Sequence, residues 1–231
     1  EDPHLLPLLY LNDGKGNLTR KADAFTAIYT TQSKIIADDI NADGHIDLFI
    51  AGRVEPWKYG ITPRSYLLQN DGKGKFSDVT SIYSKHLMNP GMVTDAHFVD
   101  LDKDGKKDLL LSSAWGTIDT YFKKGNTYNK QTLLKENGWW QSLTVTDINA
   151  DGSLDIIAGN FGLNSRLKAS SAEPVTMYIN DFDNNGRAEQ VITYYLNGKE
   201  IPFASKIQLE KSLPVLKKKF LYAEDFAKAS L

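Results

Sequence analysis

Short hydrophobic runs bounded by Gly, Asp or Asn recur along the chain. Runs of this kind between turn signals are typical of buried β-strands. Ile35-Ile36-Ala37 precedes a strongly acidic turn, and Leu48-Phe49-Ile50 follows it. Similar paired runs flank later acidic turns. The pattern therefore predicts a repeated strand–loop–strand unit and an all-β fold class.

The expected strands form repeats. Two Asn-Asp-Gly turns begin at Asn12 and Asn70, 58 residues apart, and two acidic turns begin at Asp39 and Asp100, 61 residues apart. A period of about 60 residues with four short strands is typical of β-propeller blades. The next acidic turns follow after 47 and 34 residues. The repeat therefore either shortens or carries two acidic turns in one blade.

The hydrophobic runs also give strand positions. We expect residues 8–11 and 17–19 to be the last hairpin of an earlier, incomplete blade. Strands of the next three blades are expected at 33–38, 47–51, 65–69 and 75–79; at 94–99, 108–113, 118–123 and 127–133; and at 141–146, 155–158, 174–180 and 189–195.

From Ser205 onward the spacing of hydrophobic residues changes to that of short helices. We expect them at 206–213, 215–220 and 222–231, with Pro214 in the first turn of the second helix. The basic residues at 217–219 are best explained as a solvated helix face. The predicted organisation is thus propeller blades over residues 1–204 and a helical segment over 205–231.

Composition narrows the class of protein. The 231 residues carry 27 Lys+Arg against 29 Asp+Glu, a net charge of -2, which argues against a nucleic-acid partner held by bulk positive charge. Hydrophobic residues make up 41%, which excludes a disordered chain, and no hydrophobic run is long enough to predict a membrane span. Without Cys there is no disulfide and no thiolate metal site.

Thirteen of the 29 acidic residues lie in four stretches of nine residues. Positions 1, 3, 5 and 9 of each stretch carry an oxygen-bearing side chain, and position 6 is Gly. Calcium prefers six to eight oxygen ligands in a flexible shell, and Gly lets the backbone turn tightly around the ion. The stretches are residues 39–47, 100–108, 147–155 and 181–189.

Neither an EF-hand nor an ordinary hairpin turn accounts for all four stretches. An EF-hand requires Glu at position 12 and flanking helices, but position 12 is Ile50, Leu111, Ala158 and Ile192. Ordinary Asp-Gly hairpin turns account for the loops at Asn12 and Asn70, which lack the acid that position 9 places three residues after the Gly of each acidic stretch. They do not account for four stretches that all carry one. The fourth stretch differs most from the other three, because it has Asn185 and not Asp at position 5 and Glu189 and not Asp at position 9.

The four stretches and their flanks resemble FG-GAP/VCBS repeats, the units of integrin-α-like β-propellers. Residues 52–54, 63–68, 91–96, 138–140, 158–166 and 216–220 are also similar to large bacterial surface proteins with VCBS repeats and an ASPIC/UnbV-type module. The resemblance implies blades of a seven-bladed ring. Because 231 residues at about 60 per blade make fewer than four blades, we expect a piece of a longer protein.

The resemblance also implies up to four Ca²⁺ ions, bound through loop positions 1, 3, 5, 7 and 9, with position 7 contributing its backbone carbonyl. Carried over, the ligands are Asp39, Asn41, Asp43, His45 and Asp47; Asp100, Asp102, Asp104, Lys106 and Asp108; Asp147, Asn149, Asp151, Ser153 and Asp155; and Asp181, Asp183, Asn185, Arg187 and Glu189.

Residues outside the loops suggest binding and not catalysis. No nucleophile elbow, phosphate-binding loop or zinc-protease helix is present, and His97 on an expected strand is best explained as a packed residue. Trp57 and Tyr59 lie in a long loop and Trp115 follows a strand, so these rings could contact a sugar or a protein. For Trp139 and Trp140 we expect packing between blades.

The expected function is a non-catalytic, calcium-binding module that binds a protein or glycan. Weak calcium sites suit the calcium levels outside cells. We therefore expect an extracellular or bacterial cell-surface location, associated with the outer membrane. The alternatives are a lectin-like glycan binder and, less favoured, a polysaccharide-degrading enzyme domain.

Overall fold

The computed structural model describes residues 3–162 and 165–228. The chain forms two compact units: Glu1–Pro56 with Ile61–Asn160, and Trp57–Gly60 with Phe161–Leu231. We refer to them as the first and second units. The helical segment predicted after residue 204 lies in the second unit together with the last strands. The cause is that the helical segment packs on the last strands, as described below.

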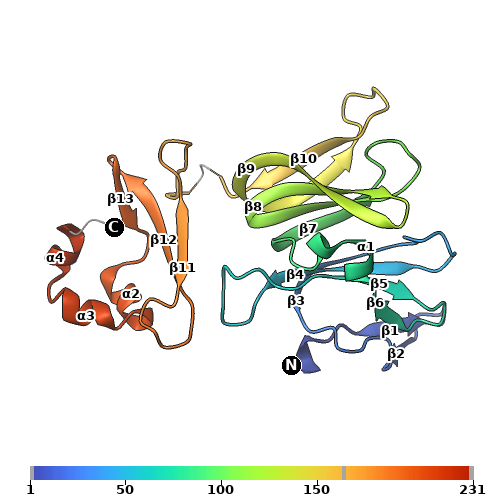
Figure 1. Ribbon diagram of the computed structural model, residues 1–231, viewed down its shortest axis with the longest axis horizontal. Coiled ribbons are helices and arrows are strands. Elements are labelled where there is room, and N and C mark those ends of the chain that lie inside the picture. The colour runs from blue at the N-terminus through green and yellow to red at the C-terminus, as the bar shows by residue number, and fades with distance from the viewer. Residues whose placement is uncertain (1–2, 163–164, 229–231) are drawn as a thin grey trace. The chain divides into compact units, whose positions relative to one another are not determined.

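Antiparallel sheets dominate the fold and confirm the all-β, propeller-like class (Figure 1). Each sheet is a meander in which consecutive strands pair. The strands of the first unit are β1 (Leu9–Asn12) and β2 (Leu18–Lys21); β3 (Thr31–Asp38), β4 (Asp47–Val54), β5 (Tyr66–Asn70) and β6 (Phe76–Asp78); and β7 (Met92–Val99), β8 (Asp108–Lys124), β9 (Thr127–Thr146) and β10 (Asp155–Asn160).

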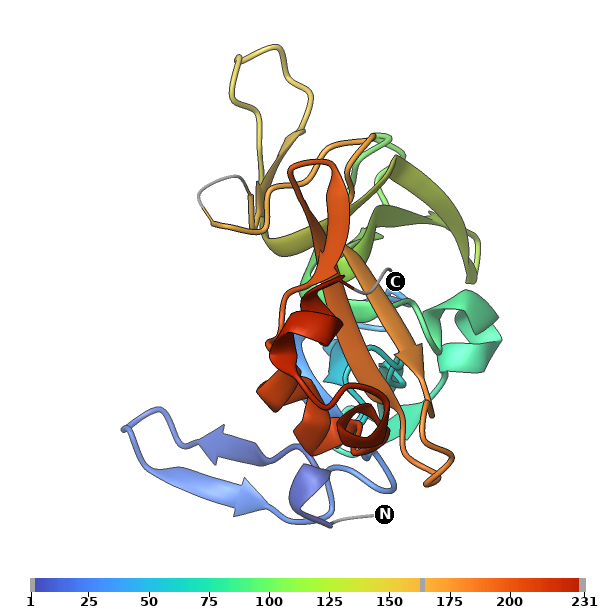
Figure 2. The same cartoon turned by 90° about the vertical axis from the view of Figure 1, so that its left-hand side faces the viewer.

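The second repeat has the predicted four strands, β3 to β6, paired in order. The pair β1 and β2 forms the predicted earlier hairpin, which Figure 2 shows in blue. Between β6 and β7 lie α1 (Thr80–Tyr83) and η2 (Lys85–Leu87), and η1 (Pro3–Leu5) lies near the N-terminus. Both hairpins at Asn12 and Asn70 are turns between paired strands, as the sequence indicated.

The third repeat differs in form from the prediction. Strands expected at 108–113 and 118–123 are one element, β8, and those expected at 127–133 and 141–146 are both part of β9. A straight strand would hold residues 108 and 123 about 50 Å apart, yet the Lys123 N–H donates to the Asp108 carboxylate over 2.9 Å. Strand β8 therefore doubles back, near Trp115, whose φ is +60°.

The predicted fourth blade is not a single sheet. Residues 140–146 of β9 pair with β10 in the first unit, whereas β11 (Thr176–Asn180), β12 (Glu189–Leu196) and β13 (Lys199–Pro202) form a separate sheet in the second. The 34-residue spacing explains this, because it leaves no room for an outer hairpin between the third and fourth acidic turns. The repeat thus becomes shorter after the third acidic turn, and the sheet formed by β7 to β10 carries two acidic turns, the second and the third.

Strands β4 and β8 are buried on both faces, which explains why their sequences contain continuous hydrophobic runs. Phe49 of β4 packs in a core with Leu109 and Leu111 of β8, between two stacked sheets (Figure 1). The alternate residue Ile50 belongs to a second core with residues of the N-terminal hairpin, and Leu110 to a third with β9 and β10. The successive sheets of the first unit are thus joined by shared cores.

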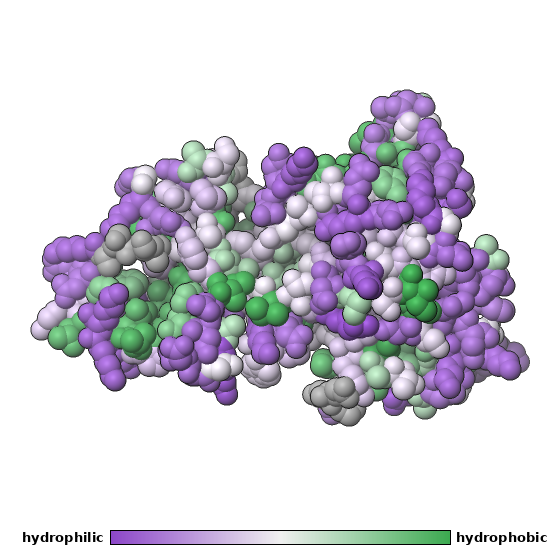
Figure 3. Space-filling view, in the orientation of Figure 1, coloured by the Kyte–Doolittle hydropathy of each residue, from purple (hydrophilic) through white to green (hydrophobic). Residues whose placement is uncertain are grey.

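In the second unit, α2 (Lys206–Ser212), α3 (Val215–Lys219) and α4 (Ala223–Lys228) confirm the predicted helices. They lie on one side of the β11–β13 sheet (Figures 1 and 2). Leu209 and Leu213 share a core with Val191 of β12, which is why sheet and helices form one unit. Hydrophobic side chains also remain on the surface of this helical region (Figure 3), among them Ile207 and Leu221. None of the described helices has the length and hydrophobicity needed to cross a membrane.

Candidate metal centre

Each acidic stretch joins two paired strands at a hairpin end. The four loops connect β3 to β4, β7 to β8, β9 to β10 and β11 to β12, and we call them the first to fourth loops. Position 9 is the first residue of the following strand in every case: Asp47, Asp108, Asp155 and Glu189. The predicted strand–loop–strand unit is confirmed four times.

The four loops share one hydrogen-bonding scheme. In the second loop, Asp100 at position 1 accepts hydrogen bonds from the backbone N–H of Asp104 (3.1 Å) and of Gly105 (2.9 Å). The residues at position 1 of the other loops, Asp39, Asp147 and Asp181, accept the equivalent bonds. Position 1 therefore fixes the loop backbone, and its carboxylate is held toward the centre of the turn.

Position 4 adopts a left-handed backbone that sequence reasoning missed. Its φ lies between +60° and +61° at Ala42, Lys103, Ala150 and Asn184. Only Asn184 belongs to a residue type that favours this conformation, so the sequence offered almost no signal. Gly at position 6, with φ of +81° to +84°, was predicted for this reason.

Position 9 is the buried anchor of the loop. Asp47 and Asp108 have no solvent exposure, and each accepts hydrogen bonds from two backbone N–H groups. For Asp108 the donors are Lys123 (2.9 Å) and Leu101 (3.1 Å). Burial raises the pKa of both Asp47 and Asp108 despite these bonds. A cation in the loop would offset the buried negative charge.

Positions 1, 3 and 9 converge where all three are acidic. The ligand atoms of Asp100, Asp102 and Asp108 lie within 4.8 Å of one another, as do those of Asp181, Asp183 and Glu189. In the first and third loops position 3 is an amide, Asn41 or Asn149, whose oxygen is also a hard donor.

The side chain at position 5 hydrogen-bonds to the backbone of position 7, unlike the side chains at positions 1 and 9. Asp43, Asp104, Asp151 and Asn185 each accept a hydrogen bond from the backbone N–H of position 7, at 2.7 to 2.9 Å. This bond is the main cause that lowers the pKa of Asp104 and Asp151, while the side chain of Asn41 is the main cause for Asp43. The position-5 carboxylates are therefore ionised and available, although they are not in the 4.8 Å clusters.

The side chains at position 7 contact different neighbours in different loops, and the Ser153 hydroxyl accepts a hydrogen bond from Lys103 of the second loop (3.1 Å). Lys106 lies 3.3 Å from the Asp104 carboxylate. The His45 ring lies so close to Gly72 that a Cβ there would meet it at 2.6 Å, which ties the first loop to the neighbouring β5–β6 turn. The roles predicted for the backbone carbonyls of all four position-7 residues stay predictions: His45, Lys106, Ser153 and Arg187.

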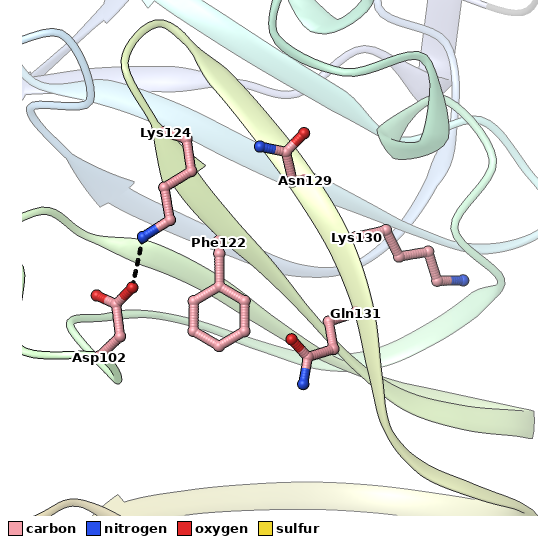
Figure 4. Close-up of a pocket in the computed structure, with 6 residues that line it drawn as sticks. All are labelled: Asp102, Phe122, Lys124, Asn129, Lys130 and Gln131. Atoms are coloured by element: carbon pink, nitrogen blue, oxygen red, sulfur yellow. Dashed lines mark hydrogen bonds and ion pairs between the residues drawn. The ribbon is translucent and has the colours of Figure 1, made fainter.

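Two lysines at the end of β8 are features that sequence reasoning missed. The Lys124 ammonium lies 2.6 Å from Asp102 and 3.5 Å from Asp104. Beside it is an open pocket of about 390 Å³, lined also by Phe122 (Figure 4). Lys123 is buried and lies over the rings of two tyrosines, and burial lowers its pKa. Only the reversal of β8 places these residues beside a loop more than a dozen residues away.

A second missed network joins the strands that carry the loops. Asp95 of β7 accepts hydrogen bonds from the Leu143 N–H of β9 (2.9 Å) and lies 3.0 Å from the Lys34 ammonium of β3. His97 Nε2 lies 3.2 Å from the Leu143 carbonyl and 3.5 Å from Asp95. His97 is thus a packed strand residue, as expected, and Asp95 links the first strands of three repeats.

The candidate ligand-binding aromatic residues lie in different units. Trp57 is 99% exposed and, with Tyr59, belongs to the second unit. Trp115 belongs to the first unit and stacks on Trp139, with ring centroids 4.9 Å apart. Trp140 donates from its indole N–H to the Gly116 carbonyl (3.1 Å) and packs in the third core, as expected for a packing residue.

Comparison with known proteins points to the same loops. A family model described as the FG-GAP-like repeat matches residues 39–111 and 100–158. Together these matches cover more than half of the chain and include the first three loops. A search of curated proteins found no match.

Proposed function

Because the chain belongs to the family of FG-GAP-like repeat proteins, we propose that it is a non-catalytic, calcium-binding β-propeller module that binds a protein or glycan outside the cell. The observation that carries this proposal is the second loop, where three carboxylates converge within 4.8 Å and one of them is fully buried. The four loops share the same scheme, so the proposal extends to up to four ions.

The residues present fit calcium better than other common ions. All side-chain donors at positions 1, 3, 5 and 9 are oxygen atoms, and there is no Cys in the chain. Oxygen-only sets favour calcium or magnesium, and the stricter octahedral shell of magnesium suits so many protein ligands poorly. Positions 1, 3 and 9 would hold the ion, and positions 5 and 7 would complete the shell.

Calcium would supply positive charge that offsets repulsion among these carboxylates. If a site has a Kd of about 10⁻⁴ M, millimolar calcium stabilises the folded chain by about 1.4 kcal/mol per site. Several sites together would rival the stability of a typical domain. Sites this weak are filled in extracellular fluids, which supports the proposed bacterial-surface or secreted location.

Asp104→Ala tests the metal role of a loop. We expect the variant to lower the Tm by about 4 °C in millimolar calcium, because one site is weakened, and to change it little in EDTA. The measurement is thermal unfolding of both proteins with calcium, magnesium or EDTA.

Asp13→Ala is the matched control, because Asp13 caps an exposed hairpin with the same kind of hydrogen bond, to the N–H of Lys15. Its effect should be the same with and without calcium. Equal losses for Asp104→Ala in calcium and in EDTA would show that this loop has a structural role only.

The second candidate function is a lectin, and the exposed Trp57 favours it. Such a ring can stack on a sugar face without first breaking contacts in the protein. Trp57→Ala is expected to leave the Tm unchanged and to abolish glycan binding on an array, and EDTA should weaken the same signal. Glycan binding that survives Trp57→Ala would count against this role.

A further inference from the structure

Lys124 distinguishes the second loop from the other three. Its ammonium lies 2.6 Å from the Asp102 carboxylate (Figure 4) and 3.5 Å from that of Asp104. Over residues 3–162 and 165–228, no other loop carboxylate forms an ion pair with a Lys or Arg from outside its own loop. Among the described residues, the second loop is therefore the one whose candidate ligands form ion pairs with a lysine from another part of the chain.

The position of Lys124 follows from the strand geometry. Side chains alternate along a strand, so Lys123 turns toward the rings of Tyr83 and Tyr128 while Lys124 faces the loop. The Lys123 N–H donates to Asp108, the last ligand of the loop, and so holds the next residue beside it.

The equivalent place in the preceding repeat carries the opposite charge. There the Asn70 N–H donates to Asp47 (2.8 Å), as the Lys123 N–H does to Asp108. Lys124 therefore corresponds to Asp71, whose carboxylate instead accepts hydrogen bonds within its own turn. The same scaffold thus presents a cation to the second loop and an anion near the first.

We propose that Lys124 is a resident counter-ion that competes with calcium and makes the second loop the last of the four to fill. The inference rests on the proposed calcium function. Without calcium, the ammonium reduces repulsion between Asp102 and Asp104 and keeps the loop formed. Binding of calcium must break both ion pairs and place a divalent charge near the displaced ammonium, so both effects weaken this one site.

The test is Lys124→Met, with Lys107→Met as the control. Lys107 is an exposed lysine of the same loop, and within the described structure its side chain forms no ion pair with the loop ligands. The two variants therefore change the net charge equally. Calcium binding to each full chain is measured by titration against a chromophoric chelator.

Lys124→Met is expected to strengthen the weakest calcium-binding step about fivefold, because breaking exposed ion pairs costs only a modest free energy. The other binding steps should stay unchanged. Lys107→Met should bind like the parent. Adding Asp102→Asn should reduce the difference between Lys124→Met and its parent, since the shorter of the two ion pairs is then lost in both while the pair with Asp104 remains. In EDTA, Lys124→Met should unfold at a lower temperature than Lys107→Met.

The outcomes separate the two proposals. A parent chain that binds no calcium at millimolar concentration overturns the proposed function itself. A parent chain that binds calcium, with Lys124→Met and Lys107→Met giving the same binding curve, overturns the role of Lys124 and leaves the calcium function intact. A gain in affinity that Asp102→Asn leaves at its full size also contradicts it, because Lys124 would then act elsewhere.

Discussion

Replacement of Asp108 by alanine is expected to lower the free energy of unfolding by about 3 kcal/mol, in EDTA as well as in calcium. The Asp108 side chain is fully buried and accepts hydrogen bonds from the N–H groups of Leu101 and Lys123. Alanine would leave both donors without an acceptor, the Lys123 N–H in a buried position and the Leu101 N–H in a part-buried one. The relief of a buried negative charge offsets only part of this loss.

Two variants separate the structural role of Asp108 from its metal role. Asp108→Asn keeps one acceptor oxygen, so in EDTA its free energy of unfolding should fall less than that of Asp108→Ala. Both variants should lose the stabilisation by calcium at this loop. Asp104→Ala, on the exposed side of the same loop, should show the calcium-dependent part alone. Urea unfolding with calcium and with EDTA gives both quantities, and an Asp108→Ala protein as stable as the parent in EDTA would refute the anchoring role.

Replacement of Asp95 by alanine is expected to cost about 3 kcal/mol whether or not calcium is present. The Asp95 side chain is 10% exposed and connects β7 to Leu143 of β9 and Lys34 of β3. Alanine would leave the Leu143 N–H and the ammonium without their partner, at the place where three repeats meet. The Lys34 side chain is 42% exposed, so most of the loss should come from the buried Leu143 N–H, and Lys34→Met alone should cost much less than Asp95→Ala.

The contribution of Asp95 should also depend on pH. Burial alone would raise the pKa of Asp95. Hydrogen bonds from the Leu143 N–H and from Lys34 outweigh burial, so the pKa is lowered. Lys34 and His97 are the side chains that face the carboxylate. Stability from a lowered pKa is present above the unfolded value of about 3.9 and is lost as the pH falls through the folded value. The difference between parent and Asp95→Ala in urea unfolding should therefore shrink on acidification; a constant difference would contradict this.

Much of the local structure could be predicted because it depends on short-range chemistry. Hydrophobic runs on both sides of each acidic stretch predicted the strand–loop–strand unit, and Gly at position 6 predicted the turn. The helices after Ser205 followed from hydrophobic spacing. The left-handed backbone at position 4 could not be predicted, because Ala42 and Lys103 adopt it only where the carboxylate of position 1 holds the rest of the loop.

Contacts between segments far apart in the chain could not be predicted from the sequence. The hydrophobic pattern predicts two strands around Trp115 but not the reversal that returns Lys123 and Lys124 to a loop formed by earlier residues. It predicts a fourth acidic stretch but not that this stretch opens a separate sheet. Asp95 looks like an ordinary strand residue, and only its partners on two other strands give it a role.

The sequence by itself determined the repeat, its strands and the oxygen ligands, because these depend on residue type at fixed spacing within a few residues. The tertiary structure alone decided which carboxylates are buried, which loop faces a lysine and where the compact units divide. The physical reason is that burial and charge pairing depend on distances between segments far apart in the chain, and these distances exist only once the sheets have stacked.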